Sequence, residues 1–434
     1  MKKMRKLNLH IALADTIPEI PPLKKDRRLG KKLYLTLAVI VALVTVTVAF
    51  VVTQTPSSAT GAETQWSKTY YGDVGRAIQT SDGGYAIAGN NASVGFFPAV
   101  ERAPTLMKTD SSGNLMWNKT FPATGHVGTA AIVQTKDGGY VLSGTNIAAP
   151  ITSPVYSGWL IKTDATGNVD WTKTFVLPLQ TCYTIEDSRG DFVVTGYAEN
   201  DHDSVDAVLM KVNVHGDLVW TKTFGGNSSK LLALNLVEAD EGGYVVEGCV
   251  IEANYNQGGW LLKTDWDGNV QWSEIYQTDE NKNLPFNSMA KTSDGGYIVT
   301  ASSFVQSWLV KIDSSGATQW IKTFEINGML RSVVEAPDGG YVAVGVQDRQ
   351  ACVVRTDSSG ALLRTELFGE VSDNVSSSVS SVIVTRDGNF VVGGTLNHYS
   401  PTTVEGFKVT PEVGEHVWLT KMPLSSMQES TASG

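Results

Sequence analysis

Short apolar runs separated by glycine-containing turns alternate along almost the whole chain after residue 65. In residues 136–175 an Asp-Gly-Gly-Tyr turn, an apolar run, a loop, a second apolar run ending in Lys-Thr-Asp, a Gly-Asn turn and a Trp-containing run follow one another. The runs are continuous and β-branched, without the i, i+3, i+4 spacing of amphipathic helices. The pattern therefore predicts strands that are buried on both faces.

One aromatic residue marks each copy of this unit. The intervals between successive copies are 55, 52, 52, 53, 44 and 49 residues, and such a period in a strand-rich chain is typical of propeller blades. We therefore predict an all-β fold, a seven-bladed β-propeller of four-stranded antiparallel blades, preceded by one transmembrane helix. The marker residues are Tyr85, Tyr140, Phe192, Tyr244, Tyr297, Tyr341 and Phe390.

Each copy resolves into four strands, A to D. In the second copy they are expected at 131–133, 140–143, 159–162 and 169–175. An Asp-Gly turn joins A to B, because glycine accepts a positive φ without strain.

Two further positions recur in the repeat and are interpreted as structural. Strand D carries a Trp nine residues after a cation in strand C, and one such Trp per blade suits a wedge between neighbouring sheets. The sixth copy has Leu363-Arg364 instead, and the seventh is expected to resume with Trp418. We expect the strand C cation to cover a Trp with its stem and to meet the Asp two residues later. The tryptophans are Trp117, Trp171, Trp220, Trp272 and Trp320, and the cations are Lys108, Lys162, Lys211, Lys263, Lys311, Arg355 and Lys408.

Closure of the ring has two candidate strands. Residues 64–70 read as a strand D with no A, B or C before it, and an orphan strand of this kind completes the last blade and removes a sheet edge. Residues 417–421 are a second candidate strand D. We favour closure by the N-terminal copy.

The N-terminal region predicts a membrane anchor. Residues 1–32 hold ten Lys or Arg and three Asp or Glu, and residues 33–52 carry no charge. A helix of 20 residues spans about 30 Å, the thickness of the bilayer core, and the flanking positive charge predicts a cytoplasmic N-terminus. A cleaved signal peptide is the alternative. Residues 53–63 are expected to be a linker, 64–421 the propeller and 422–434 a disordered tail.

Charge and cysteines exclude some classes of protein. The chain has a formal net charge of −10, and its acidic body argues against nucleic-acid binding. The three cysteines, Cys182, Cys249 and Cys352, show no metal-binding spacing. They are expected to be buried apolar residues, with a disulfide between Cys182 and Cys249 as an alternative.

Function is expected on the variable loops, because the A–B and C–D turns are short and uniform whereas the other connections vary. Within these loops the pair Phe96-Phe97 is a candidate for contact, although such a pair more often packs against its own loop. An acidic cluster is a candidate for binding a cation, although such a cluster is more often only solvated. Residues 265–269 resemble a calcium loop but lack its downstream Glu, so a plain turn is expected. The variable loops are 90–104, 145–157, 197–206, 249–258, 276–287 and 369–379, and the acidic cluster is Glu199, Asp201, His202, Asp203 and Asp206.

The run at 164–171, Asp-Ala-Thr-Gly-Asn-Val-Asp-Trp, resembles the tryptophan-docking repeat of quinoprotein-like propellers, and more loosely the repeats of uncharacterised membrane-anchored prokaryotic and archaeal propellers. The resemblance covers roughly residues 65–421 and implies the propeller fold. The turn in this chain is one residue shorter, the blade count is seven where the quinone dehydrogenases have eight, and their adjacent Cys-Cys pair is absent. Quinone chemistry is therefore not expected.

The sequence thus favours a membrane-anchored extracytoplasmic propeller that binds a protein or an envelope polymer, with no nucleic-acid partner. No catalytic, cofactor-binding or metal-binding residues are predicted, and no cofactor. An enzyme with its site on the variable face and a surface-layer or adhesion component are the alternatives. The enzyme would need converging polar residues, which the scattered histidines do not supply. These histidines are His126, His202, His215, His398 and His416.

Overall fold

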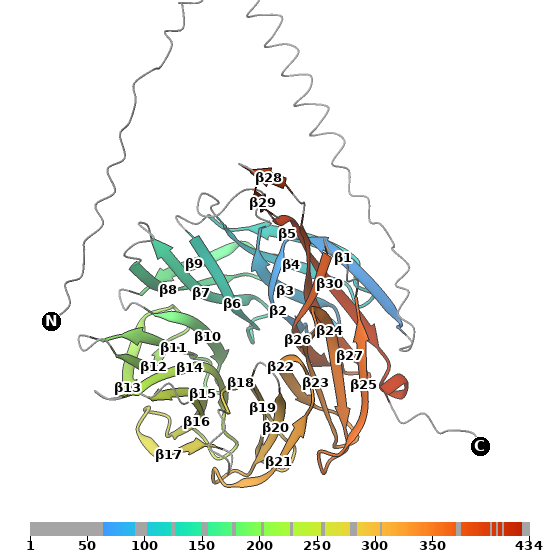
Figure 1. Ribbon diagram of the computed structural model, residues 1–434. Coiled ribbons are helices and arrows are strands. Elements are labelled where there is room, and N and C mark those ends of the chain that lie inside the picture. The colour runs from blue at the N-terminus through green and yellow to red at the C-terminus, as the bar shows by residue number, and fades with distance from the viewer. Residues whose placement is uncertain are drawn as a thin grey trace, which may run out of the picture. The chain divides into compact units, whose positions relative to one another are not determined.

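A computed structural model shows a ring of seven four-stranded antiparallel sheets (Figure 1). The first of the four strands of each sheet lies nearest the ring axis, and all described residues belong to one compact unit within 54–434. The structure describes residues 64–91, 102–122, 126–148, 155–175, 179–200, 204–225, 229–252, 257–277, 284–303, 306–369, 375–399, 402–404, 407–409 and 412–427.

The sheets are numbered blades 1 to 7, and the strands of each blade run from the innermost outward. Blade 1 consists of β2 (Asp73–Gln79), β3 (Tyr85–Asn90), β4 (Pro104–Thr109) and β5 (Leu115–Thr120), and blade 2 consists of β6 (His126–Gln134), β7 (Tyr140–Ala148), β8 (Val155–Thr163) and β9 (Val169–Thr174). Blade 3 consists of β10 (Gln180–Glu186), β11 (Phe192–Glu199), β12 (Val205–Val212) and β13 (Leu218–Phe224). Blade 4 consists of β14 (Ser229–Glu238), β15 (Tyr244–Glu252), β16 (Gln257–Thr264) and β17 (Val270–Tyr276). Blade 5 consists of β18 (Phe286–Lys291), β19 (Tyr297–Ser302), β20 (Ser307–Ile312) and β21 (Thr318–Phe324). Blade 6 consists of β22 (Gly328–Glu335), β23 (Tyr341–Gln347), β24 (Gln350–Thr356) and β25 (Leu362–Phe368). Blade 7 consists of β26 (Val375–Val384), β27 (Phe390–Tyr399), β30 (Glu412–Met422) and β1 (Trp66–Tyr71).

The A–B turns close as the Asp-Gly signal predicts. In blade 2 the N–H of Gly138 donates to the carbonyl of Thr135 at 2.8 Å, and Gly138 takes a φ of +86°, which side chains with a Cβ rarely adopt. The carboxylate of Asp137 accepts from the N–H of Gly139 at 2.9 Å. The turn is therefore held by its own side chain as well as by its backbone.

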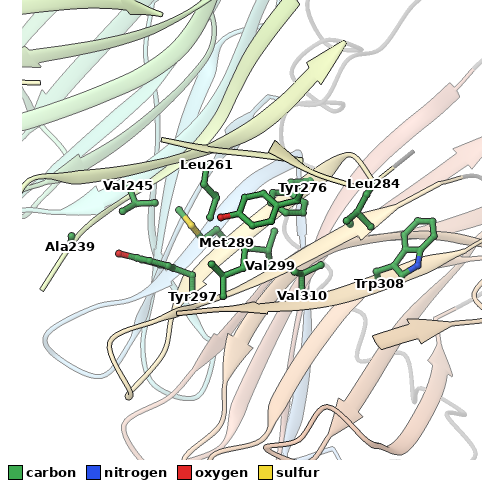
Figure 2. Packing of buried hydrophobic residues seen from close by; sticks show 13 residues of the cluster. Ala239, Val245, Leu261, Tyr276, Leu284, Met289, Tyr297, Val299, Trp308 and Val310 are labelled. Atoms are coloured by element: carbon green, nitrogen blue, oxygen red, sulfur yellow. The ribbon is translucent and has the colours of Figure 1, made fainter. Parts of the chain in front are cut away.

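The blades pack through their apolar faces. Between blades 4 and 5, Val245 and Leu261 meet Met289, Tyr297 and Val299 in one buried cluster (Figure 2). Both faces of the inner strands are covered in this way, which explains their continuous apolar runs: β3, β4, β19 and β20 are buried at every residue.

The N-terminal strand closes the ring, as predicted. β1 pairs antiparallel with β30, and its Trp66 lies opposite Lys421. The same register joins Trp171 to Lys162 within blade 2, so Trp66 supplies the strand D tryptophan of blade 7. The interpretation of residues 417–421 as a strand D is wrong, because they lie in β30, the third strand of that sheet.

Two other assignments in the last repeat change with it. Lys408 is not the strand C cation; it lies in β29 (Phe407–Val409), which pairs only with β28 (Thr402–Val404). Lys421 takes the strand C position and forms an ion pair with Asp387. Trp418, three residues before it, corresponds to the strand C Trp159 and not to a strand D tryptophan. An inserted hairpin between β27 and β30 therefore separates this blade's second and third strands.

The strands extend further than their apolar runs indicated. β7 and β8, for example, cover 140–148 and 155–163, against the expected 140–143 and 159–162. Beyond β30 the chain forms one 3-10 turn, η1 (Leu424–Met427). The predicted anchor, residues 33–52, lies outside the described residues, and within the described ranges no helix has the length and apolarity to cross a bilayer.

Candidate functional site

Each variable loop is described only in part, and its middle lies outside the described residues. Of the candidate positions in them, Phe96-Phe97 and residues 201–203 are not described, so the predicted contact pair and most of the acidic cluster stay predictions. Glu199 ends β11 and is exposed, and Asp206 lies opposite Ala198 in β12. Across the parts of the chain that the structure describes, no three His, Cys, Asp or Glu side chains are grouped so that they could hold a metal ion.

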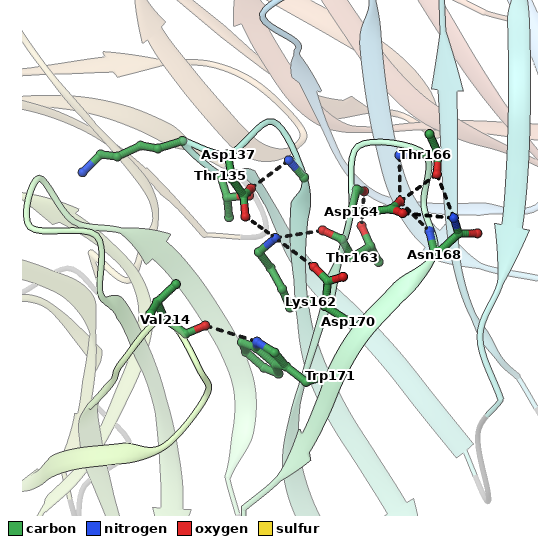
Figure 3. A network of polar contacts seen from close by, with 12 residues as sticks. Thr135, Asp137, Lys162, Thr163, Asp164, Thr166, Asn168, Asp170, Trp171 and Val214 are labelled. Carbon is green, nitrogen blue, oxygen red and sulfur yellow. Dashed lines mark hydrogen bonds and ion pairs between the residues drawn. The ribbon is translucent and has the colours of Figure 1, made fainter.

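Residues 265–269 form the turn that was predicted. The carboxylate of Asp265 accepts hydrogen bonds from the N–H of Asp267 at 2.9 Å and of Asn269 at 2.8 Å. In the equivalent turn of blade 2, Asp164 accepts from the N–H groups of Thr166 and Asn168 (Figure 3). These carboxylate oxygens therefore hold the backbone of the turn.

The strand C cations are structural, but the carboxylate that they meet lies elsewhere in the sequence than expected. The ammonium of Lys162 is buried and lies 2.8 Å from Asp137 in the A–B turn, whereas Asp164, two residues later, closes the C–D turn (Figure 3). Burial alone would raise the pKa of Asp137, but hydrogen bonds from Lys162 and Thr135 outweigh it and bring the pKa to about 2. The same pairing joins Lys108 to Asp82, Lys311 to Asp294, Arg355 to Asp338 and Lys421 to Asp387.

Each strand D tryptophan contacts the next blade at a glycine. A Cβ on Gly216, in the C–D turn of blade 3, would lie 3.0 Å from Cζ3 of Trp171 in blade 2. The indole N–H of Trp171 donates to the carbonyl of Val214 in the same turn (Figure 3). Arg364 replaces this tryptophan in blade 6, and the neighbouring blade 7 has no covalent C–D turn, because its outer strand β1 comes from the other end of the described chain. The missing tryptophan and the missing turn therefore coincide.

The repeat breaks between blades 3 and 4. Asp187, fully buried, accepts from Lys211 at 2.9 Å and from the Tyr244 hydroxyl at 2.7 Å, and these bonds hold the pKa of its carboxyl below the usual value against the effect of burial. The turn position of Asp137 is occupied in this blade by Arg189, whose guanidinium lies 4.0 Å from the ring centre of Trp266. The network is satisfied within itself, so it serves as a replacement for the regular ion pair.

Glu247 is the most unusual buried group. It lies in the middle of β15, is inaccessible to solvent, and neither carboxylate oxygen has a hydrogen-bond partner among the described residues. Burial raises its pKa to about 8. Blades 3, 5 and 6 carry Thr195, Thr300 and Val344 at the equivalent place. No feature of the sequence pattern distinguishes this glutamate except its departure from an apolar run.

The cysteines and histidines supply no reactive cluster in the described ranges. Cys249 and Cys352 are free, buried thiols, and burial raises the pKa of each to about 12. The alternative disulfide between Cys182 and Cys249 is therefore wrong. His215 lies in the C–D turn of blade 3, where its main-chain N–H donates to the side chain of Asn213, and the ring of His416 meets Tyr71 edge to face. The side chains of His126, His202 and His398 lie outside the described set.

The innermost strands carry charged residues that the sequence analysis did not single out. Arg331, in β22, is exposed, and the guanidinium of Arg76, in β2, lies 4.6 Å from the ring centre of Tyr183 in β10. Figure 1 shows the blade that contains β6 between the blades of β2 and β10, so this stack joins two blades that are not neighbours in the ring. The signal available in the sequence was a cation interrupting an apolar strand A.

No protein-family model matches the sequence, and no curated protein is significantly similar to it. Among solved structures, the chain is similar to a streptogramin B lyase, with 11% identity, a TM-score of 0.49, and coverage of 81% of this chain and 97% of that one. A catalytically inactive virginiamycin B lyase from Staphylococcus aureus shares 10% identity over 82% and 100% of the two chains, with a TM-score of 0.46. A Bacteroides caccae protein of unknown function shares 13% identity over 64% and 94%, with a TM-score of 0.40. These are likenesses in fold.

Proposed function

We propose that this chain is a single-pass, membrane-anchored propeller outside the cytoplasm, which binds a protein or an envelope polymer through its variable loop face. The observation that carries the proposal is that the polar side chains that recur from blade to blade stabilise the ring itself through hydrogen bonds to the turns. Asp137 bonds Lys162 and its own turn, and Asp164 bonds its own turn. The ring thus supports the proposal as a rigid scaffold, whose loops are the part that varies.

The face on which the chain enters the ring also supports binding through the variable loops. The N–H of Gln65 donates to the carbonyl of Lys421, and Met422 lies opposite Phe390, directly after an A–B turn. The chain therefore joins the ring on the face of the A–B and C–D turns. The variable B–C and D–A connections are on the opposite face, so an attachment before residue 64 leaves them free for a ligand.

The resemblance to tryptophan-docking repeats is consistent with a membrane-anchored propeller that acts as a binding scaffold. Trp117, Trp171 and Trp220 each lie against a turn glycine of the following blade, which is a regular feature of the scaffold. The sequence lacks the adjacent Cys-Cys pair that the dehydrogenases carry. The resemblance supports a propeller of the membrane-anchored prokaryotic kind more than one of the dehydrogenases.

The location is tested in intact host cells that produce the full chain. Added protease is expected to digest the propeller without lysis, and a variant without residues 33–52 is expected to lose its membrane association. A chain that is protected in intact cells and digested only after lysis would contradict the proposed location.

The binding face is tested by shortening loops. Blade 6 joins β23 to β24 through only Asp348 and Arg349, so the fold accepts a two-residue B–C connection. Residues 149–154 lie between the paired residues Ala148 and Val155, and residues 252–256 lie between Ile251 and Gln257, so replacing each segment by Asn-Gly keeps the strand register. The replacement is expected to abolish co-sedimentation of the detergent-solubilised full chain with detergent-washed host envelope fragments, while the melting temperature changes little. The control is Lys119→Ala on the outer strand β5. Undiminished co-sedimentation after every B–C loop has been shortened would refute the proposal.

A further inference from the structure

A β-bulge or equivalent irregularity interrupts every innermost strand at the same level. The pairing with the second strand shifts in all seven blades between the positions 74/76, 129/131, 180/183, 233/235, 286/288, 330/332 and 379/381. A bulge leaves an extra residue unpaired and re-aims its side chain. Neighbouring blades cover both faces of these strands, so a bulged side chain either bonds a neighbouring blade, as Asn287 does at the carbonyl of Leu330, or is open to the ring axis.

Arg331 is the charged residue among these bulge positions in the described chain. It lies between Leu330 and Ser332, which are 0% and 5% exposed, and is itself exposed. An exposed side chain between two buried neighbours in the middle of an inner strand is reached by solvent from the axis. Gly75, Ala130 and Ser380 occupy the same bulge position in blades 1, 2 and 7 and are small.

Arg76 lies at nearly the same level, one position beyond the bulge of blade 1. Its guanidinium lies over the Tyr183 ring, and the strand between them has Ala131 at the equivalent position, whose short side chain does not obstruct the arginine. Stacking of this kind holds a guanidinium plane flat and leaves its N–H edge free to donate. Two arginines from different blades, which we call the axial arginine pair, are therefore directed to the axis at one depth.

No described carboxylate neutralises the axial arginine pair. Asp73, on the same strand as Arg76, forms its ion pair with Arg102 at 3.3 Å. The glutamates of the inner strands lie at their turn-face ends and accept main-chain N–H groups: Glu186 from Lys136, Glu238 from Ser188 and Glu335 from Ser293. Lys230, exposed in β14, adds a further positive charge toward the loop face. Among the described residues of the inner strands, the positive charges at the bulges and toward the loops are therefore not matched by carboxylates, although the whole chain is acidic.

We infer that the axial arginine pair, Arg76 and Arg331, binds an oxyanion group (carboxylate, sulfate or phosphate) that enters from the loop face. The inference rests on the proposed binding function and names the chemistry of its ligand. A guanidinium fork matches two oxygens of such a group, and charge-assisted hydrogen bonds of this kind are about twice as strong as neutral ones. Lys230 increases the local concentration of the anion without fixing its orientation.

The test measures binding of three probes, inorganic phosphate, inorganic sulfate and glucuronate, to the full chain in a mild detergent by isothermal titration calorimetry. At least one probe is expected to bind, with an affinity that falls as sodium chloride is raised. Arg331→Gln is expected to lower the affinity for that probe by about tenfold or more, because a charge-assisted hydrogen bond to the anion is lost. Arg331 is exposed, so the variant should fold, which its melting temperature checks.

The matched control is Lys322→Gln on the outer strand β21, which makes the same change in net charge away from the axis and should leave the affinity within about twofold. Tyr183→Leu should weaken binding less than Arg76→Gln, because it frees the arginine without removing its charge. Failure of all three probes to bind, or an equal loss in Lys322→Gln and Arg331→Gln, would overturn the inference. Envelope co-sedimentation that survives Arg331→Gln but not loop shortening would refute this site and leave the proposed function standing.

Discussion

The main-chain N–H of Arg386 donates a hydrogen bond of 2.9 Å to the side-chain oxygen of Gln79, across 307 residues of sequence. This bond latches the A–B turn of blade 7 to the last residue of the innermost strand of blade 1. Four other junctions repeat it, and between blades 4 and 5 the ion pair of Asp240 with Lys291 takes its place. The four repeats join Ser81 to Gln134, Lys136 to Glu186, Ser188 to Glu238 and Ser293 to Glu335.

The remaining junction, between blades 6 and 7, lacks both halves of the latch at once. Pro337 stands at the donor position and has no N–H, and Val384 stands at the acceptor position and has no polar atom. The donor N–H groups of the other junctions are exposed, so water can satisfy a donor whose protein partner is absent. The joint replacement between blades 6 and 7 therefore removes the whole hydrogen bond.

Removing the acceptor at ring closure is expected to weaken the fold. Gln79→Leu should lower the free energy of unfolding by about 1 kcal/mol, because the Arg386 N–H loses its partner. Chemical denaturation measures the change. Gln79→Glu keeps an acceptor oxygen and should behave like the natural chain, and a similar loss in both variants would mean that the latch contributes nothing.

The glycine beneath each strand D tryptophan is expected to be indispensable. Gly216 has a φ of +78°, and an added Cβ would also lie 2.8 Å from Cγ of Lys173, so Gly216→Ala should destabilise the fold by about 1–2 kcal/mol from backbone strain alone. Thermal unfolding followed by circular dichroism would detect this as a lower midpoint. A midpoint equal to that of the natural chain would contradict the docking contact.

A second variant tests whether a tryptophan without its glycine has any effect. Arg364→Trp restores the strand D residue in blade 6, but blade 7 offers no C–D turn to receive it. We expect no gain in unfolding midpoint. A rise of several degrees would show that the tryptophan acts through burial alone and that the turn is not its partner.

Glu247 should make stability fall as pH rises. Its pKa is raised from 4.5 to about 8 in the folded chain, so the folded state holds a proton that the unfolded state releases between these values. The stability present below pH 4.5 is therefore lost progressively up to about pH 8, by an amount on the order of several kcal/mol. Urea unfolding midpoints at pH 5 and pH 8.5 measure this loss.

The repeat itself supplies the control for Glu247. Thr195, at the same place in blade 3, donates to the carbonyl of Val208 at 2.9 Å, so Glu247→Thr replaces the orphan carboxyl with a group that has a partner. The variant should exceed the natural chain in stability by more at pH 8.5 than at pH 5. An advantage that is equal at both pH values would show that the glutamate is not protonated in the folded chain.

The pair of Lys162 and Asp137 should respond unequally to loss of either partner. Asp137→Ala leaves a buried ammonium and is expected to cost about 1–3 kcal/mol, reduced from the cost of a fully buried pair because Asp137 is 59% exposed. Lys162→Met removes the buried charge and should cost less. Denaturation at pH 7 ranks the two variants, and the reverse order would contradict a charge-based explanation.

The same pair predicts an acid response. The pKa of Asp137 lies at about 2, below its ordinary value of 3.8, so its stabilising contribution is complete above pH 3.8 and is lost as pH falls toward 2. The pKa values of Asp82 and Asp294 are also lowered to about 2, so the losses of stability from the three carboxylates add up as pH falls. Proton uptake on acid unfolding, measured by potentiometric titration, should decrease in Asp137→Ala.

The sequence was sufficient to predict the blades, because glycine turns and tryptophans repeat with the structural unit. It misassigned the last blade because strands C and D both carry a Trp and a Lys. The spacing separates them: Trp418 precedes Lys421 by three positions, as in strand C of blade 2, whereas Trp66 precedes Lys68 by two, as in strand D. The inserted β28–β29 hairpin concealed this by moving Lys421 away from its usual distance after Phe390.

The axial arginine pair and the partner of each strand C cation could not have been found in the same way. The bulges that turn Arg331 to the axis depend on strand pairing, and the approach of Arg76 to Tyr183 joins blades that are not neighbours. Likewise, Lys162 has an Asp two residues later and another 25 residues earlier, and only the turn geometry selects the earlier one. Spacing along a chain does not encode such choices.

Because β1 completes the sheet that begins with β26, the first strand of the propeller to leave the ribosome has to wait for the last. Ser67 and its hydrogen-bond partner Thr420 are 353 residues apart. At about 5–20 residues per second, translation separates their appearance by roughly 20–70 s. During that interval the nascent chain exposes an unpaired strand with an apolar tryptophan. Closure of the ring by its N-terminal strand therefore requires either a chaperone that binds this strand or a slow, late pairing of β1 with β30.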